Sequence, residues 1–338
     1  MKTKAILLVN LGSPNSCEVS DVKTYLNEFL MDKRVIDIKN PWRTLLVKGI
    51  IVPFRAAKSA AKYKTIWTDK GSPLIQITKQ LTAAVQQKSG LPTYMCMRYA
   101  NPTPESVLHQ MKKDLPDLKE VVLLPLYPHY AMSSYETAVE HVLEAHKKNN
   151  FSFSIKTVPP FYNHPKYIDA LTESIKPYLQ QDFHHLLFSY HGIPERHIRK
   201  SDVTESHCLS CENCCNMESK AHSFCYRHQV FETTKLVTEK LGLSKDKYSI
   251  SFQSRLNEKW LKPFTDIVLA DFPKKGLTKM VVVSPAFVSD CLETLEEIQV
   301  ETKEIFMHHG GEQYTAIPCM NTQPLWVDAV CELIKETI

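Results

Sequence analysis

Three features are missing from this sequence, and each absence argues against a class of protein. No apolar run approaches the roughly 20 residues that a membrane-spanning helix needs. The net charge is only +4, and no Lys/Arg run or basic-aromatic alternation is present, which excludes a typical nucleic-acid partner. The apolar stretch Ala5 to Val9 is too short for a secretory signal, and Asn10 to Pro14 reads as a turn rather than a cleavage site. We therefore expect a cytoplasmic protein.

The sequence does contain a regular alternation of strand and helix signals over 338 residues, a length that suits about two domains. Short apolar runs predict strands at 5–11, 93–97, 121–126, 153–157, 186–188, 248–252, 280–283 and 314–317. Segments with helical spacing lie at 19–31, 104–115, 133–148, 165–178, 219–241, 292–307 and 324–337. Such alternation predicts parallel sheets with helices on both faces.

Two self-similar patterns indicate that the halves of the chain share one architecture. Gly12-Ser13-Pro14 follows the first expected strand as Gly192-Ile193-Pro194 follows a later one. A second pattern, at one constant offset, pairs Pro128, Tyr130, Glu136, Thr137 and Glu140 with Pro285, Phe287, Glu293, Thr294 and Glu297. We predict an α/β fold of two doubly wound domains, residues 1–160 and 161–322, with the active-site cleft between them. The boundary should fall near Val158-Pro159-Pro160-Phe161.

His191 is the first candidate for chemistry, because it stands where a buried strand ends. The run 186–188 is short and unbroken, as expected of a strand buried on both faces, and Gly192 and Pro194 end it. Ligands of open α/β sheets bind at that edge. An imidazole there can accept protons or ligate a transition metal, and a hydrogen-bonded core histidine is the alternative.

Glu293 is the second candidate, because it follows the loop after strand 280–283 and begins a helix. The helix dipole stabilises an anion at that position. Glu297, Glu301 and Glu304 continue a stripe along the same helix. We predict that His191 and Glu293 face each other across one cleft, and that Glu297 and Glu301 form an acidic path for protons or cations. A solvated helix face is the alternative for Glu301 and Glu304.

Five of the ten cysteines crowd into one loop, residues 207–226, which predicts a metal centre. A secreted disulfide framework would instead be spread through a small chain. Four thiolates can hold zinc or an iron–sulfur cluster, and spacing alone does not choose between them. One of the five would be spare, and the nearby histidines are lesser candidates. The set comprises Cys208, Cys211, Cys214, Cys215 and Cys225, with His207, His222 and His228.

A third group of residues suits a large apolar ligand that carries carboxylates. Arg98 and Tyr99 follow strand 93–97, where they could line a cleft, and a solvated strand-end Arg with aromatic packing is the alternative. Arg55 and Tyr63 lie in the amphipathic stretch 41–63, and Ser72 follows shortly after it. Arg and Ser bind carboxylates, whereas the apolar stretch predicts a hydrophobic flap, a membrane-touching lip or core packing.

With these residues in view, the chain resembles a ferrochelatase, the family that inserts ferrous iron into a porphyrin. The resemblance covers nearly the whole chain. Its motifs are Ala5 to Gly12, Trp67 to Leu74, Met97-Arg98-Tyr99, Phe188 to Pro194, Phe252-Gln253-Ser254-Arg255 with Trp260, and Phe287 to Glu297. It implies a lyase that converts protoporphyrin IX and ferrous iron into protohaem with release of two protons. The alternatives are a coproporphyrin III ferrochelatase and a non-catalytic haem or metal carrier.

The resemblance also implies roles for individual residues. The expected fold is chelatase-like, with two Rossmann-like domains and a C-terminal helix, 323–338, that packs back on the first. His191 and Glu293 match the metal and proton-transfer residues. The porphyrin-contacting positions, by the same resemblance, are Leu11, Arg55, Tyr63, Ser72, Arg98, Tyr99 and Trp260. The stretch 45–54 matches the lip that admits a hydrophobic substrate, often at a membrane surface, so peripheral membrane contact is expected there.

Three further positions carry finer implications of the resemblance. The cysteine loop resembles an internal cluster of some bacterial members, which implies [2Fe-2S] rather than zinc, with Cys208, Cys214, Cys215 and Cys225 as ligands and Cys211 as the spare. Cys291 stands where many relatives carry His. Leu11 stands where coproporphyrin-using relatives tend to carry Tyr, which favours protoporphyrin IX.

Overall fold

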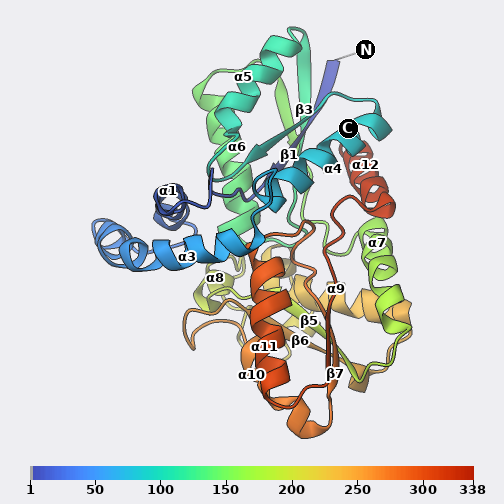
Figure 1. Cartoon of the computed structure of the whole chain (residues 1–338). Helices are drawn as coiled ribbons and strands as arrows, with labels where there is room; N and C mark the ends of the chain where they lie inside the picture. The colour runs from blue at the N-terminus through green and yellow to red at the C-terminus, as the bar shows by residue number, and fades with distance from the viewer. Residues whose placement is uncertain (1–2) are drawn as a thin grey trace. The chain divides into compact units, whose positions relative to one another are not determined.

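A computed structural model describes residues 3–338 as two compact units, each built on one four-stranded parallel sheet (Figure 1). The first unit comprises residues up to Leu126, Met132–Pro159 and Val330–Ile338. The second comprises Tyr127–Ala131 and Pro160–Ala329. The limits predicted for the domains, and the packing of the C-terminal helix on the first domain, stay predictions.

The sheet of the first unit has the order β2-β1-β3-β4, from strands Thr93–Met97, Thr3–Asn10, Leu118–Pro125 and Ser154–Thr157. Consecutive residues of β1, Ala5 to Val9, are fully buried, as expected of a central strand covered on both faces. The helical segments of this unit are α1 Val19–Met31, α2 Trp42–Thr44, η1 Leu45–Ile51, α3 Val52–Ile66, α4 Pro73–Ser89, α5 Pro104–Asp114, η2 Met132–Glu136 and α6 Thr137–Lys148.

The sheet of the second unit repeats that plan in the order β6-β5-β7-β8, from strands Tyr248–Gln253, His185–His191, Lys279–Val283 and Gln313–Ala316. Its α-helices are α7 Pro165–Ile175, α8 Glu195–Lys200, α9 Tyr226–Leu241, α10 Thr265–Asp271 and α11 Thr302–His308. The π-helix η8, Glu293–Glu301, precedes α11, and short 3-10 turns include η3 Lys176–Leu179, η4 Cys214–Asn216, η5 Lys220–Phe224, η6 Lys245–Lys247 and η7 Pro273–Lys275. Helix α12, Pro324–Thr337, contributes residues to both units.

The prediction of two doubly wound α/β domains is confirmed by this repeated strand order. In both units the segment after the third strand forms a π-helix, η2 after β3 and η8 after β7. The self-similar pattern that pairs Glu136 with Glu293 therefore marks equivalent places in the two units. π-Helical turns are rare and occur mostly at functional sites.

The helix predictions differ from the structure in several places, and the segment 133–148, for example, is the π-helix η2 followed by α6. The segment 219–241 is not one helix, because Cys225 is extended and separates η5 from α9. The segment 292–307 is a π-helix followed by an α-helix rather than one α-helix. Helix α4 was missed, because Pro73 reads as part of a turn although proline also suits the first turn of a helix.

Gly12 fixes the loop that follows β1 against the loop that follows β2. Its φ is +106°, in the region that favours glycine, and an added Cβ would lie 1.9 Å from the carbonyl oxygen of Tyr99. The carbonyl of Leu11 accepts the backbone N–H of Tyr99 at 2.9 Å. The two loops therefore meet at one edge of the first sheet.

Candidate active site

His191 is the last residue of β5, and its ring is half-buried at the carboxyl end of the sheet. Its Nδ1 lies 2.7 Å from the carbonyl oxygen of Gly192. Because a carbonyl only accepts, Nδ1 carries the hydrogen, and the lone pair is left on Nε2. The Nε2 atom is therefore the one available to take a proton or to bind a metal ion.

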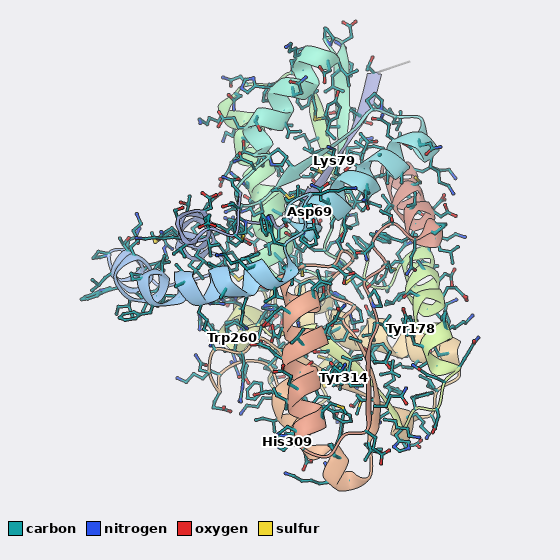
Figure 2. All side chains as sticks on the ribbon, viewed as in Figure 1. Asp69, Lys79, Tyr178, Trp260, His309 and Tyr314 are labelled. Carbon is teal, nitrogen blue, oxygen red and sulfur yellow. The ribbon has the colours of Figure 1, made fainter. Side chains whose placement is uncertain are left out.

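The loop after His191 requires glycine at position 192. Its N–H donates to the carbonyl of Gln253 at 2.8 Å. A Cβ there would lie 2.8 Å from that same oxygen and 3.3 Å from the ring of Trp260. Trp260, labelled in Figure 2, thus lies beside the His191 loop in the second unit.

The buried carboxylate of Asp290 lies three residues before Glu293, the first residue of η8. One oxygen of Asp290 accepts the Thr294 hydroxyl at 2.9 Å and the Cys319 N–H at 3.1 Å, and the other accepts the Asn321 amide at 2.7 Å. These bonds fix the turn from which the π-helix begins. Asp290 is therefore a positioning residue that the sequence motif contained but did not explain.

Glu297 lies one helical turn further along η8 and is bound at both oxygens by Ser254. The Ser254 N–H donates to one oxygen at 2.9 Å, and its hydroxyl donates to the other. Ser254 has a φ of +62°, which is uncommon for a residue other than glycine and occurs often at functional sites. The loop after β6 is thus shaped to hold this carboxylate.

The charges of Glu297, Glu293 and His191 influence one another. Burial raises the pKa of Glu297, the hydrogen bond from Ser254 opposes that rise, the His191 charge lowers it and the Glu293 charge raises it. The backbone places two of these groups near each other, because His191 is paired in register with Gln253 and the next residue, Ser254, binds Glu297. His191 and Glu297 therefore lie near each other in the second unit, whereas the pairing of His191 with Glu293 and the binding of substrate iron stay predictions.

Two further side chains, Phe287 and Cys291, lie close to His191 and Glu293. The ring of Phe287 lies 6.2 Å from the His191 ring, in an edge-on arrangement. Cys291, where many relatives carry His, is buried, and burial together with the Glu293 charge raises the pKa of its thiol well above the usual value. Without a bound cation, the thiol therefore stays protonated at neutral pH.

The outer members of the predicted acidic path differ in exposure. Glu301, the last residue of η8, is half-buried, whereas Glu304 on α11 is exposed. Because η8 is a π-helix, the α-helical stripe predicted for the glutamates does not apply to it. Glu304 thus lies on a solvated helix face. The acidic path through Glu297 and Glu301 stays a prediction.

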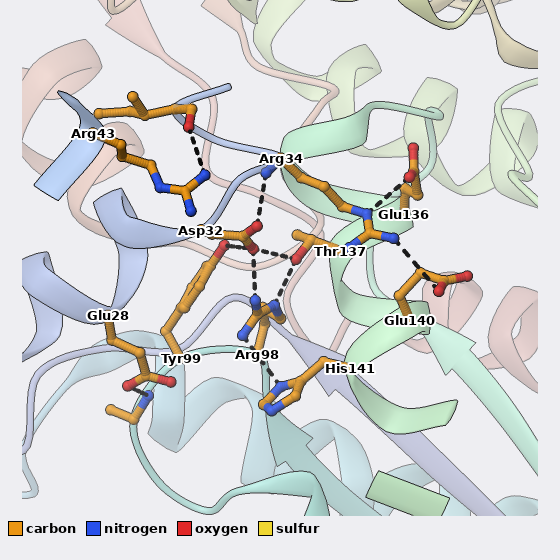
Figure 3. Close-up of polar contacts among 12 residues, drawn as sticks. Glu28, Asp32, Arg34, Arg43, Arg98, Tyr99, Glu136, Thr137, Glu140 and His141 are labelled. Atoms are coloured by element: carbon orange, nitrogen blue, oxygen red, sulfur yellow. Dashed lines mark hydrogen bonds and ion pairs between the residues drawn. The ribbon is translucent and has the colours of Figure 1, made fainter. Parts of the chain in front are cut away.

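A second polar group lies in the first unit and centres on Asp32 (Figure 3). One oxygen of Asp32 accepts Arg98 Nη2 at 2.6 Å, the Tyr99 hydroxyl at 2.8 Å and the Thr137 hydroxyl, and the other accepts the Arg34 N–H at 2.8 Å. Burial alone would raise the pKa of Asp32, but these hydrogen bonds and the Arg98 charge lower it. Asp32 is therefore ionised, and we call it, together with Arg98, Tyr99 and Thr137, the Asp32 hub.

The contacts of Arg98 and Tyr99 differ from the predicted cleft-lining role. Arg98 Nε donates to the Thr137 hydroxyl at 2.7 Å, and its Nη1 lies 3.2 Å from His141 Nδ1. Tyr99 is 0% exposed. The structure thus shows both side chains bound into the Asp32 hub, and any direct contact with the porphyrin stays a prediction. Sequence reasoning missed Asp32, Thr137 and His141.

The remaining predicted porphyrin residues of the first unit differ in exposure. Leu11 is half-buried beside the Tyr99 backbone, and Arg55 is exposed on α3. Tyr63 is buried and packs edge-on against Tyr25, with ring centres 6.3 Å apart. Ser72 is buried at the N-cap of α4. Their assignment to porphyrin binding, like that of Trp260 in the second unit, stays a prediction.

Four of the five clustered thiols converge inside their loop. The Cys225 thiol is hydrogen-bonded to those of Cys208 and Cys215, and the Cys215 thiol is also hydrogen-bonded to that of Cys214. All four are buried. Cys211 is exposed instead, with its sulfur 3.9 Å from that of Met217. Cys211 is therefore not among the four thiols that converge.

Charged neighbours hold this thiol group in place. Arg227 Nη1 donates toward the sulfurs of Cys215 at 3.4 Å and Cys214 at 3.7 Å. The Asp202 carboxylate accepts the backbone N–H groups of His207 at 2.8 Å and Cys208 at 2.7 Å. Across residues 3–338, no three Cys, His, Asp or Glu side chains are grouped so that they could hold one metal ion.

The repeated parallel sheets, with an imidazole and carboxylates at the sheet edge of one unit, define a chelatase-like protein. Solved structures agree with that class. SirB from Bacillus subtilis with Fe3+ superposes with a TM-score of 0.57 at 12% identity, covering 99% of this chain and 95% of that one. The sirohydrochlorin chelatase SirB from Bacillus subtilis subspecies spizizenii in complex with cobalt gives 0.55, with the same identity and coverage. This likeness shows the fold alone.

The sequence comparisons narrow the class. A family model described as Ferrochelatase matches residues 3–338. A ferrochelatase of Opitutus terrae is 47% identical over 99% of this chain and 98% of its own length. One of Pseudomonas aeruginosa is 44% identical over 98% of both. The chain belongs to the ferrochelatase family, the lyases that insert iron into protoporphyrin to make haem, and the predicted family is confirmed.

Proposed function

We propose that this chain inserts ferrous iron into protoporphyrin IX through His191, Glu293 and Glu297. The single observation that carries the proposal is that a half-buried imidazole with its Nε2 lone pair free shares its electrostatic surroundings with two carboxylates. The family comparisons do not favour coproporphyrin III as the substrate or a non-catalytic carrier.

The reaction requires two kinds of group, and this site supplies both. Ferrous iron enters the ring as a dication, and two protons leave the pyrrole nitrogens, so charge balances. Imidazole nitrogen and carboxylate oxygen both ligate Fe²⁺, and they can replace its water ligands before the pyrrole nitrogens do. The one lone pair of His191 Nε2 binds either the iron or a proton, so His191 accepts a pyrrole proton only after the iron has passed to the ring. Glu297, whose pKa burial raises, is a better proton acceptor than an exposed carboxylate and can take the other proton.

The number of haem molecules formed per protein chain distinguishes an enzyme from a haem carrier. The pure protein would be incubated with protoporphyrin IX and excess ferrous iron under anaerobic conditions, and haem would be measured by its absorption. We expect many haem molecules per chain. Haem that never exceeds one per chain would identify a carrier and overturn the proposal.

The thiols Cys208, Cys214, Cys215 and Cys225 suit a [2Fe-2S] cluster. Each iron of such a cluster takes two protein thiolates, and the four buried sulfurs that converge here are the number that one [2Fe-2S] cluster needs. Zinc, which also takes four thiolates, is the alternative. The Arg227 guanidinium would donate hydrogen bonds to the ligand sulfurs. When bound, a cluster supplies a one-electron redox centre.

A pair of cysteine variants tests the ligand set. Cys215→Ser is expected to abolish the visible charge-transfer bands of the fresh protein and to lower its iron content, because it removes one ligand. Cys211→Ser is the matched control and should keep both, because Cys211 is exposed and its sulfur contacts that of Met217. Stoichiometric zinc in a colourless wild-type protein would contradict the cluster.

The helical segment from α2 to α3 suits peripheral contact with a membrane, in a protein that we propose works in the cytoplasm. Trp42, Leu45, Ile50 and Phe54 are exposed, Phe54 to 83%. Seven Lys and Arg residues and no acidic one lie between Lys39 and Lys64. Exposed apolar side chains with basic neighbours are typical of helices that lie at an anionic lipid surface. Among residues 3–338, no helix is both long enough and apolar enough to cross a membrane.

Vesicle sedimentation tests this contact. Phe54→Ser is expected to weaken binding to vesicles of anionic phospholipid several-fold, because it removes the most exposed aromatic ring of the segment. Ile267→Ser, which changes an exposed apolar residue on α10, should leave binding unchanged. Equal losses in the two variants, or no binding by the wild type, would contradict the proposal.

A further inference from the structure

We infer that Tyr226 is a positioning residue through which the cysteine loop sets the orientation of His191. The inference rests on the proposed function and adds a link that neither the sequence motifs nor the family comparisons supply. It concerns three adjoining parts of the second unit, which are the end of β5, the first turn of α9 and the loop that precedes α9.

The peptide unit between His191 and Gly192 is held at both of its polar ends. Its carbonyl oxygen accepts the Tyr226 hydroxyl at 2.9 Å. Its N–H donates to the carbonyl of Gln253 at 2.8 Å. Fixing this plane fixes the backbone on both sides of it, and therefore also the Gly192 carbonyl that accepts His191 Nδ1–H. The direction of the free Nε2 depends on these bonds.

Tyr226 begins α9, and the residue before it is one of the four converging thiols. The thiol of Cys225 is hydrogen-bonded to those of Cys208 and Cys215. On the other side of Tyr226, Arg227 donates to Cys215 Sγ and to the carbonyl of Glu212, and His228 Nδ1 bonds the carbonyl of Cys215 at 2.9 Å. The first turn of α9 is thus joined to the thiol group on both sides of Tyr226.

The rest of α9 is anchored independently of the thiols. The Thr233 hydroxyl donates to the carbonyl of Tyr162 at 2.7 Å, and the Thr234 hydroxyl lies 2.8 Å from that of Tyr190. By contrast, residues 201–224 of the described chain form only turns and short 3-10 segments. A loop of that kind takes its shape from side-chain contacts, so a change at its sulfurs reaches the first turn before the remainder of the helix.

If Tyr226 served only to pack the core, the aromatic ring would be the part of the side chain that matters. The ring packs edge-on against that of His129, with centres 5.9 Å apart. The proposed role resides in the hydroxyl alone. Tyr226→Phe keeps the ring and removes only the hydrogen bond to His191, so it separates the two roles.

The first test measures steady-state kinetics of Tyr226→Phe in the complete protein. We expect kcat for iron insertion to fall roughly 5- to 10-fold, with KM for protoporphyrin and the visible spectrum of the thiol loop unchanged. Tyr135→Phe is the matched control, because its buried hydroxyl likewise donates to a backbone carbonyl, that of Val158, at 2.7 Å. Its kcat should stay at the wild-type value.

The second test has a readout other than activity. Hydrogen–deuterium exchange would be measured for peptides spanning residues 185–193 in the wild type, Cys208→Ser, Tyr226→Phe and the double variant. We expect each single variant to raise exchange near Gly192 and the double variant to add nothing further, because both act through one contact. Cys211→Ser should exchange like the wild type.

Two outcomes would overturn the inference, and they differ from failure of the proposed function. Unchanged kcat in Tyr226→Phe excludes the positioning role, and unchanged exchange in Cys208→Ser excludes the link to the loop. Turnover retained by His191→Ala would instead refute the proposed function, whatever Tyr226→Phe does.

Discussion

Replacement of His191 by Ala is expected to lower the turnover of iron insertion by about 10²- to 10⁴-fold, the usual contribution of a positioned general base. The variant loses the Nε2 lone pair that the bond from Nδ1 to the Gly192 carbonyl keeps available. Protoporphyrin should still bind, because most of the binding free energy of a large apolar ring comes from burying its two faces. Haem formation would be followed by absorption and porphyrin affinity by fluorescence quenching.

The control for His191→Ala is a histidine outside the site. His309, labelled in Figure 2, follows α11 and is exposed. His309→Ala should therefore keep wild-type turnover. If His191→Ala retains more than about a tenth of wild-type turnover, general-base catalysis by this residue is excluded.

Replacement of Asp32 by Asn is expected to lower the free energy of unfolding at pH 7 by about 3–5 kcal/mol, because it breaks a buried ion pair. Asn has nearly the same size, so packing is preserved. However, it cannot compensate the charge of Arg98, and it adds a donor where Arg98, Tyr99 and Thr137 already donate. Urea unfolding followed by circular dichroism measures the loss.

The pH dependence of that loss gives a second check. The folded structure lowers the pKa of Asp32 below its unfolded value, which is about 3.9. Its stabilisation is therefore complete above that value and is lost as the pH falls through the folded pKa. The difference between wild type and Asp32→Asn should shrink on acidification.

The matched control for Asp32→Asn is a carboxylate in an exposed ion pair. Asp182 pairs with Lys279, but its side chain is 71% exposed. Asp182→Asn should change stability little, because exposed pairs are screened by water and salt. Equal losses in the two variants, or a loss that does not depend on pH, would contradict the role assigned to Asp32.

The fold was predictable because its signals are local. Buried strands such as β1 and β5 read as short apolar runs, and their alternation with helices specifies parallel sheets. The errors arose where one residue overrides a periodic pattern. Cys225 interrupts the predicted helix 219–241, and its extended conformation accompanies sulfur contacts to Cys208 and Cys215 that sequence periodicity does not encode.

The candidate site was only partly predictable. His191 and Glu293 could be proposed from the sequence because His191 ends one strand and Glu293 begins the helix after another, and the carboxyl ends of parallel strands form ligand-binding edges. Asp32 carries no such signal, since its partners Arg98 and Thr137 are 66 and 105 residues away. Tyr226 is likewise known only through its bond to the carbonyl of a residue 35 positions earlier. A hydrogen bond to a backbone carbonyl cannot be predicted from the pattern of side chains along a sequence.

The location of a bound substrate metal tests the central claim most directly. Crystals of the protein would be soaked anaerobically with Fe²⁺, and the ion would be located by anomalous scattering at the iron edge, apart from any iron in the cysteine loop. We predict a peak within coordination distance of His191 Nε2 and of a carboxylate oxygen of Glu293. A well-occupied peak elsewhere in the second unit, with none at these atoms, would contradict the account.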